Sequence, residues 1–335
     1  MIITLLMGAI FGFLLQYAKL NRYNTISGMA MLKDYSVAKA IAVAIGVGAI
    51  LINVEVALDL ATYHMKPFML TGIMAGGLLF GIGMAILGYC PGTLVVSLGE
   101  GSMDALVGLL GGFAGGILYT ILTPNIIELM GPNIGKVSLN SVLPDNRIIF
   151  FILVFVIAAM FVGIAFWLNG KEKKTNMKWL YAGIGLAILN TILFLPGVAN
   201  RGLGASTLYP YLGDLMSGLT ENAYFEKITK SGDWQIYFMG GAFLAGLIMS
   251  LIEKRFKFTL IHDNWKKYKN NSSASRIFWA FFAGLIMIFG ARMAGGCTSG
   301  HVLSGGMQLS FGSLVFGAFV FAGLLITGRV FYRSN

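Results

Sequence analysis

Long apolar blocks, separated by short polar segments, are the main pattern along this chain. A helix needs about 20 apolar residues to cross the ~30 Å hydrocarbon core of a membrane. The first block starts at Met1 without a basic region or a cleavage site, so we interpret it as a retained span. The pattern predicts nine transmembrane helices, at 1–17, 37–58, 69–88, 104–123, 147–168, 178–195, 235–252, 276–295 and 312–331.

The composition supports a membrane protein. Of the 335 residues, 57% are hydrophobic and 11% are charged, and the mean hydropathy is +0.78. Soluble domains carry about 25% charged residues, so a soluble enzyme, a DNA-binding domain and a disordered chain are excluded. A membrane β-barrel would show alternating apolar and polar positions, which the blocks do not. The sequence therefore predicts an all-α polytopic membrane protein.

The net charge of +10 is explained by topology, because the cations lie between apolar blocks. We expect no nucleic-acid partner. One set of connections carries most of the basic residues: Lys19, Arg22, Lys33, Lys171, Lys173, Lys174, Lys254, Arg255, Lys257, Lys266, Lys267 and Lys269. The positive-inside rule places this set in the cytoplasm. The N-terminus would then lie outside and the C-terminus inside.

Two glycine-rich segments resemble each other, one starting at Gly83 and the other at Gly290. In each, a Cys follows seven residues after the Gly, a Ser seven residues after the Cys, and a Gly two residues later. These residues are Cys90, Ser97 and Gly99 in the first copy and Cys297, Ser304 and Gly306 in the second. A weaker match joins Asn21–Arg22 to Asn200–Arg201. Chance resemblance of glycine-rich helix ends is the alternative interpretation.

With the predicted orientation, the two copies enter the membrane from opposite sides. We therefore expect an inverted-topology repeat, with residues 1–170 as the first half, 171–177 as a basic cytoplasmic linker and 178–335 as the second half. In transporters of this plan the substrate site lies near the midplane, between the repeats.

The segments that follow each cysteine, and residues 201–216, are too short and too apolar for external domains. We expect them to be short re-entrant helices that line a pathway, because irregular backbone at membrane depth is tolerated only there.

Both cysteines precede residues that can open a helix. Pro91 suits a first helical position, and Thr298 or Ser299 can cap the second half-helix. The free N–H groups of such helix ends attract anions. The candidate pathway residues of these motifs are Cys90, Pro91, Gly92, Thr93, Cys297, Thr298, Ser299, Gly300 and His301. Three alternatives stay open: buried structural cysteines, a disulfide, and a metal site formed by Cys90, Cys297 and His301.

Three arginines extend the candidate pathway. Arg292 lies inside an apolar span, five residues before Cys297, where a charge is costly and usually functional. Arg22 and Arg201 lie in connections on opposite sides and can attract anions at the two mouths; ordinary surface cations are the alternative. We expect no cofactor, no resident metal and no catalytic residue.

The motifs GFLLQ, GYCPGT and GGCTSGH resemble those of the YeeE/YedE family of bacterial inner-membrane proteins. The resemblance implies import of a sulfur compound, thiosulfate, passed along Cys90 and Cys297 by transient S–H···S hydrogen bonds. The family's first motif ends in a third Cys, and Asn21 occupies that position here. A related oxyanion, a persulfide or a selenium compound therefore stays open as the substrate.

We expect a transporter rather than an enzyme. The competing class is a membrane sulfurtransferase or thiol redox protein that handles persulfide or selenium compounds. Redox enzymes of this kind usually need a close C-x-x-C pair, whereas Cys90 and Cys297 are far apart in sequence. The expected partners are a small sulfur anion, membrane lipid and a cytoplasmic sulfurtransferase. The basic segment 253–276 could dock such a protein, but lipid contact or topology anchoring explains it more simply.

Overall fold

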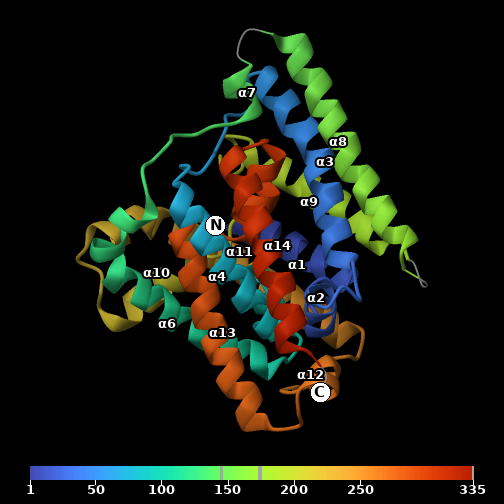
Figure 1. Ribbon diagram of the computed structural model, residues 1–335, viewed down its shortest axis with the longest axis vertical. Helices are drawn as coiled ribbons and strands as arrows, with labels where there is room; N and C mark the ends of the chain where they lie inside the picture. The colour runs from blue at the N-terminus through green and yellow to red at the C-terminus, as the bar shows by residue number, and fades with distance from the viewer. Residues whose placement is uncertain (144–145, 173–175, 334–335) are drawn as a thin grey trace.

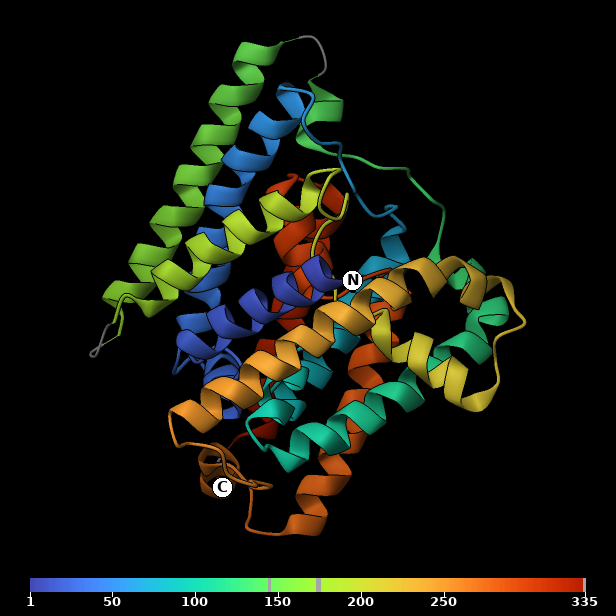
Figure 2. The same ribbon diagram turned by 180° about the vertical axis from the view of Figure 1, so that it is seen from behind.

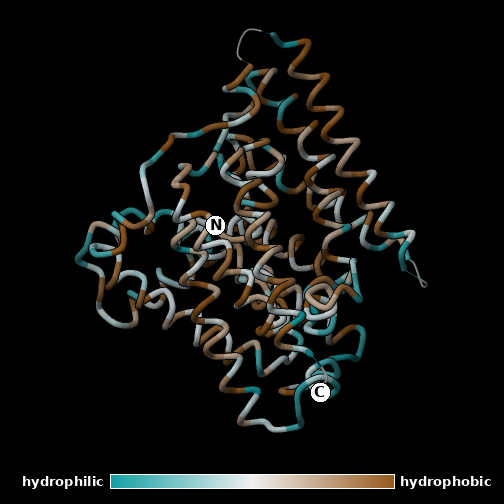
Figure 3. The backbone as a smooth tube through the Cα atoms, viewed as in Figure 1, coloured by the Kyte–Doolittle hydropathy of each residue, from teal (hydrophilic) through white to brown (hydrophobic). Residues whose placement is uncertain are grey.

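The computed structural model describes residues 1–143, 146–172 and 176–333, and every regular element in these ranges is a helix (Figure 1). The predicted all-helical class is confirmed. Apolar residues follow the long helices, and polar residues gather in the connections, including the segment around the short helix α12 (Asp263–Tyr268) (Figure 3).

All nine predicted blocks are helical. The long helices are α1 (Ile2–Tyr17), α3 (Ser36–Ala57), α4 (Leu70–Leu87), α6 (Met103–Ile126), α8 (Arg147–Gly170), α9 (Lys178–Phe194), α11 (Ala223–Ile252), α13 (Ser273–Met293) and α14 (Phe311–Phe331). The largest difference from the prediction is at α11, which begins twelve residues before 235. The polar stretch there continues the helix, because the Asn222 side chain caps it by accepting the Phe225 N–H.

Seven helical segments of the described chain are long and apolar enough to cross a membrane. One of the seven joins α4 to the short helix that follows it. Helices α1 and α9 are apolar but only 16 and 17 residues long. The multi-pass class is therefore shown, whereas the predicted count of nine spans is not confirmed.

Short helices occupy the segments that we expected to be re-entrant. They are α5 (Pro91–Gly99), α10 (Leu208–Ser217) and η2 (Thr298–Gly305), which is a π-helix. Most residues of these three helices are buried. A further short helix, α2 (Tyr23–Ala30), follows α1 and is almost fully buried. The remaining short elements are η1 (Glu128–Met130), α7 (Leu139–Val142) and α12.

The long helices pack in a reciprocal pattern. Helix α1 packs on α11, and α9 packs on α3. In the same way α4 packs on α14 and α13 packs on α6, while α4 and α13 contact each other at the centre. Helix α8 packs mainly along α3 and lies at the edge of the molecule (Figures 1 and 2).

Glycine allows the closest of these helix contacts. A Cβ atom at Gly8 of α1 would lie 1.8 Å from the carbonyl oxygen of Phe238 in α11. Gly8→Ala is therefore expected to force the two helices apart and destabilise the fold by about 1–3 kcal/mol, the usual cost of overpacking. The measurement is the thermal unfolding midpoint of the purified protein in detergent. Gly163→Ala is the matched control, because nothing lies within 4 Å of a Cβ at that position.

Candidate functional site

Cys90 caps the N-terminus of α5. Its Sγ accepts the Thr93 N–H at 3.5 Å, and the Thr93 hydroxyl accepts the Cys90 N–H at 2.8 Å. Pro91 occupies the first turn, as predicted. Helix α4 ends at Leu87, and the next residue, Gly88, has φ +79° and would place a Cβ against the Tyr23 ring. This turn and the cap together fix the thiol at the start of α5.

Cys297 takes the equivalent place at the start of η2. The prediction that Thr298 or Ser299 caps this helix is wrong, because η2 begins at Thr298 and Cys297 is itself the N-cap residue. The Cys297 Sγ lies 3.1 Å from the Ser299 hydroxyl. Backbone N–H groups of Gly300 and Ala205 also face this sulfur. Cys297 is therefore surrounded by hydrogen-bond donors from two connections of the second half.

The two cysteines share one site. The Thr298 hydroxyl, next to Cys297, faces the Cys90 thiol. The Tyr209 hydroxyl of α10 donates to the Pro91 carbonyl oxygen at 2.7 Å, next to Cys90. Both thiols are free, so the disulfide alternative is contradicted. The two sequence motifs, 207 residues apart, thus meet in the folded chain.

His301 does not face the cysteines as a ligand. Its Nε2 lies 2.7 Å from the Ala294 carbonyl oxygen and therefore carries the proton that is donated to this oxygen. Its Nδ1 lies 3.0 Å from the Ser313 hydroxyl and accepts a hydrogen bond from it. Both ring nitrogens are therefore engaged in local hydrogen bonds. No group of three metal-ligating side chains occurs in the described residues, and the metal alternative receives no support.

Each of the two matched serines contacts a connection between helices, and Ser304 also donates to the Asn190 side chain at 2.9 Å. Ser97 of α5 donates to the Asn21 carbonyl oxygen at 2.5 Å, and the Asn21 amide donates to the Ser97 hydroxyl at 3.2 Å. Ser304 of η2 faces the Leu203 carbonyl oxygen at 3.2 Å. Each serine thus holds the connection between the first two helices of its own half. Asn21 is fully buried in this contact.

Gly92 and Gly300, at these helix starts, both face the connection between α9 and α10, and only Gly92 lies too close to a neighbour for an unstrained Cβ. A Cβ at Gly92 would lie 3.2 Å from the Phe11 ring and 3.7 Å from Ala205. A Cβ at Gly300 would lie 3.7 Å from the Leu203 carbonyl oxygen. The connection between α9 and α10 therefore runs between the two cysteine motifs.

A basic cavity of about 240 Å³ lies beside the Cys297 motif. Arg292 lines it and donates to the Tyr224 hydroxyl at 2.7 Å and to the Thr207 hydroxyl at 3.1 Å. Lys66 and Lys227 also line it, and the described lining residues include no carboxylate. An anion is the ligand that this charge distribution favours. We call this space the Lys66 cavity.

Arg22 and Arg201 occupy different places relative to their helices. Arg22 directly precedes α2, whereas Arg201 lies six residues before Thr207, which precedes α10. The guanidinium of Arg201 packs over the Trp234 ring, 4.3 Å from its centroid. The weaker sequence match between the two Asn-Arg pairs therefore does not correspond to equivalent positions in the fold.

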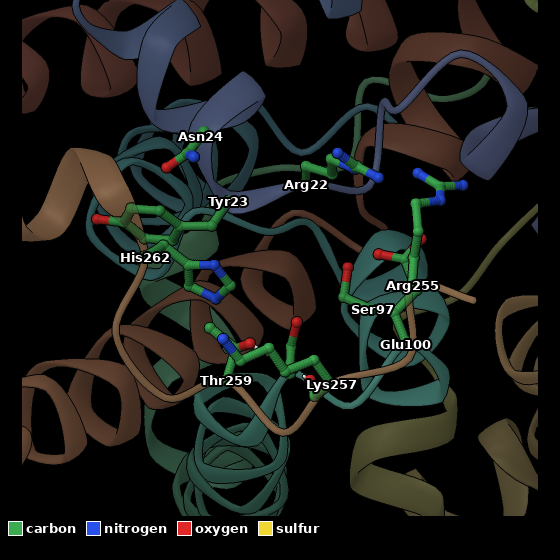
Figure 4. A pocket seen from close by; sticks show the side chains of 10 residues that line it. Arg22, Tyr23, Asn24, Ser97, Glu100, Arg255, Lys257, Thr259 and His262 are labelled. Carbon is green, nitrogen blue, oxygen red and sulfur yellow. Dashed lines mark hydrogen bonds between the residues drawn. The ribbon is translucent and has the colours of Figure 1, made fainter. Parts of the chain in front are cut away.

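A second basic cavity, of about 350 Å³, contains Arg22 (Figure 4). Its other charged side chains are Arg255, Lys257 and Glu100, and Ser97 forms part of its wall. We call it the Arg22 cavity. The cysteine site thus has the Lys66 cavity beside Cys297, while the Arg22 cavity lies at the end of α5, two turns from Cys90.

The sequence did not indicate a buried ion pair that supports the site. Arg276 of α13 and Asp104 of α6 are both fully buried, and Nη2 lies 2.5 Å from Oδ2. Arg276 also donates to the carbonyl oxygens of Ile86 and Leu87. The pair therefore holds the last turn of α4, directly before the Cys90 turn. Lys66 was likewise missed, since a lone lysine in a connection gives no signal of its own.

The fold and the site together define a multi-pass helical membrane protein with two cysteines between basic cavities. Residues 18–326 match the family model described as sulphur transport, and the chain belongs to this family. The resemblance seen in the motifs is thereby confirmed. The chain is 25% identical over 331 residues to the thiosulfate transporter TsuA of Spirochaeta thermophila, covering 92% of each protein. It is 22% identical over 318 residues to the thiosulfate transporter TsuA of Escherichia coli, covering 89% of this chain and 85% of that one.

Proposed function

We propose that this protein imports thiosulfate across the bacterial inner membrane and acts as a transporter, not an enzyme. The observation that carries the proposal is the shared site of Cys90 and Cys297, each at the start of a short buried helix. The names of the relatives from S. thermophila and E. coli support the substrate.

The proposed architecture is an inverted repeat of residues 1–170 and 178–335, with α5, η2 and α10 as re-entrant helices. The reciprocal helix packing and the contacts of Ser97 and Ser304 with connections between helices support it. Within the linker 171–177, residues 173–175, including Lys173 and Lys174, lie outside the described part of the chain. The N-terminus would lie outside and the C-terminus in the cytoplasm.

The route begins in the Lys66 cavity. Arg292 and Lys66 attract the dianion toward Cys297, where the N–H groups of Gly300 and Ala205 add donors. Thr298 then links this point to Cys90. Hydrogen bonds to a charged group contribute only about 1.5–3 kcal/mol each, and thiols are weak donors. Such weak serial sites suit passage, because a tightly held anion would not leave.

The thiols must be protonated while the anion passes. A thiolate and a dianion about 4 Å apart would repel each other by about 8 kcal/mol at an effective dielectric of 20. A protonated thiol instead donates a hydrogen bond to the terminal sulfur or an oxygen of thiosulfate. The pathway therefore transfers the anion without forming a covalent bond.

Whole-cell growth tests the proposed function. A strain that lacks its own sulfur uptake should grow on thiosulfate as the sole sulfur source when it expresses this chain. Growth on sulfate alone should not be restored. Failure of thiosulfate to support growth, with the protein present in the membrane, would overturn the proposal, and rescue by another sulfur compound would redirect it to that substrate.

Lys66 gives the transporter a predicted pH dependence. Lys66 is exposed as a whole, but the loss of water around its ammonium group in the cavity, followed by the charges of Arg292 and Arg201, lowers its pKa to about 8. Lys66 is charged below this pH and neutral above it, so uptake should fall as the external pH rises through about 8. The measurement is the initial rate of thiosulfate uptake from pH 6.5 to 9.

Three variants isolate this effect. Lys66→Gln should lower uptake several-fold at pH 7 and remove the decline, because the attracting charge is absent at every pH. Lys66→Arg should retain uptake up to pH 9, since arginine stays protonated. Lys230→Gln, an exposed lysine outside the cavity, is the control and should behave as the wild type. An unchanged decline in Lys66→Arg would show that another group titrates.

A further inference from the structure

The Arg22 cavity has no part in the entry route, and its walls come from both halves of the chain. The connection between α1 and α2 supplies Arg22, and the connection between α11 and α12 supplies Arg255 and Lys257. Ser97 and Glu100, at the end of α5, complete this side of the cavity (Figure 4). The cavity therefore lies where the α5 helix that starts at Cys90 ends.

Backbone hydrogen bonds fix the segment that carries the second-half cations. The Met103 N–H donates to the Thr259 carbonyl oxygen at 2.8 Å, and the Thr259 N–H donates to the Gly101 carbonyl oxygen at 3.0 Å. Gly101 has φ +95°, and a Cβ there would lie 2.6 Å from the Lys257 carbonyl oxygen. At the far end of the segment, His262 Nε2 lies 3.0 Å from Asp104 Oδ1. These hydrogen bonds therefore fix the position of the segment that carries Arg255 and Lys257.

Positive charge exceeds negative charge around this space. Among the described lining residues, three cations face one carboxylate, that of Glu100. The guanidinium groups of Arg22 and Arg255 point toward one another (Figure 4). Arg255 also pairs with Glu253, outside the cavity lining. Two guanidinium groups that face the same cavity favour an anion between them, even with Glu100 and Glu253 nearby.

The titration of neighbouring groups agrees with this charge excess. The charge of Arg22, followed by burial and the charge of Arg255, lowers the pKa of Lys19. Burial lowers the pKa of Arg22, Arg255 lowers it further, and Glu100 raises it. The charge of Arg255 therefore penalises the charged form of Arg22, and a bound anion would relieve that penalty.

We propose that the Arg22 cavity is a second binding site, for a small doubly charged oxyanion held between Arg22 and Arg255, with Lys257 contributing charge. Glu100 faces the same cavity and competes with the anion for the arginines, which keeps the affinity low enough for release. Under the proposed function, this is the exit site for thiosulfate. Binding itself needs no transport and can be tested separately.

The test uses the purified full chain in detergent, with Thr259→Cys as a reporter at the cavity wall. The probe is inorganic sulfate, which has two charges and does not react with maleimides. Sulfate should slow maleimide labelling of the reporter, and chloride at equal ionic strength should not. The protein without the reporter gives the background from Cys90 and Cys297.

The test is made specific by variants that remove either a cation or the carboxylate, because these should change the protection by sulfate in opposite directions. Arg255→Gln and Arg22→Gln should each raise the half-protecting sulfate concentration about tenfold, the loss expected for one charge-assisted contact. Glu100→Gln should lower it, because the competing carboxylate is removed. Lys266→Gln, an exposed cation on α12 that does not line the cavity, is the control and should leave protection unchanged.

Equal protection by chloride, or unchanged protection in a folded Arg255→Gln variant, would overturn the site. If Arg22→Gln does not fold, sulfate protection measured in variants of the exposed residues Arg255 and Lys257 still tests the site. Sulfate protection without thiosulfate uptake would reject the proposed function and keep the site. Thiosulfate uptake without sulfate protection would reject the site and keep the proposed function.

Discussion

Cys90→Ala is expected to abolish thiosulfate uptake while the protein stays folded in the membrane. Cys90 lies at the start of α5, between the Thr298 hydroxyl and the route to Asn21, so its loss interrupts the chain of donors. Alanine keeps the backbone of the turn but supplies no hydrogen bond. The measurement is initial uptake of radiolabelled thiosulfate into proteoliposomes, normalised to inserted protein.

Two further variants show whether the thiol itself is needed. Val95→Ala removes side-chain volume from the same buried helix without touching a donor, and it should retain most uptake. Cys90→Ser restores a hydroxyl donor, and we expect lower uptake than in the wild type but more than in Cys90→Ala. Full activity of Cys90→Ala would reject the cysteine pathway.

Arg276→Met is expected to cause the largest loss of stability in the chain. The substitution leaves Asp104 buried without its arginine partner, with Tyr89 and His262 still beside it. It also removes the donors to the Ile86 and Leu87 carbonyl oxygens. Breaking a buried pair in this way costs about 3–5 kcal/mol. We expect a large drop in the thermal unfolding midpoint in detergent and a reduced yield of folded protein.

A double variant separates the lone charge from the lost packing. Arg276→Met combined with Asp104→Asn should recover part of the stability, because no uncompensated carboxylate remains buried. Arg329→Met, which removes an exposed arginine near the end of α14, is the control and should change stability by less than about 1 kcal/mol. A loss in the double variant as large as in the single one would show that the ion pair is not the cause.

The sequence predicted most helix boundaries within three residues, because apolar blocks of membrane length have few alternative interpretations. It failed at the start of α11, where a polar stretch continues the helix beyond the apolar block. It could not separate a span from a helix of 16 or 17 residues. Local hydropathy reports which residues favour lipid, and it does not report where a backbone hydrogen-bonding pattern ends.

For the site, the repeat motif predicted more than single residues did. The matched spacing places Cys90 and Cys297 each directly before a short helix, and places Ser97 and Ser304 each against a carbonyl oxygen of a connection. The predicted capping residue of η2 was wrong, because a helix start can shift by one residue without changing the sequence pattern. Contacts between distant segments, such as Arg276 with Asp104, leave no local pattern at all.

The central claim is that thiosulfate crosses intact. The decisive measurement is proteoliposome uptake of thiosulfate labelled in either sulfur, followed by analysis of the lumen and mass spectrometry of Cys90. We predict equal accumulation of both labels, intact thiosulfate in the lumen and an unmodified thiol. Release of sulfite, with one sulfur atom retained as a Cys90 persulfide of +32 mass units, would contradict the account, because that outcome is sulfur transfer (RS⁻ + S₂O₃²⁻ → RSS⁻ + SO₃²⁻) and not transport.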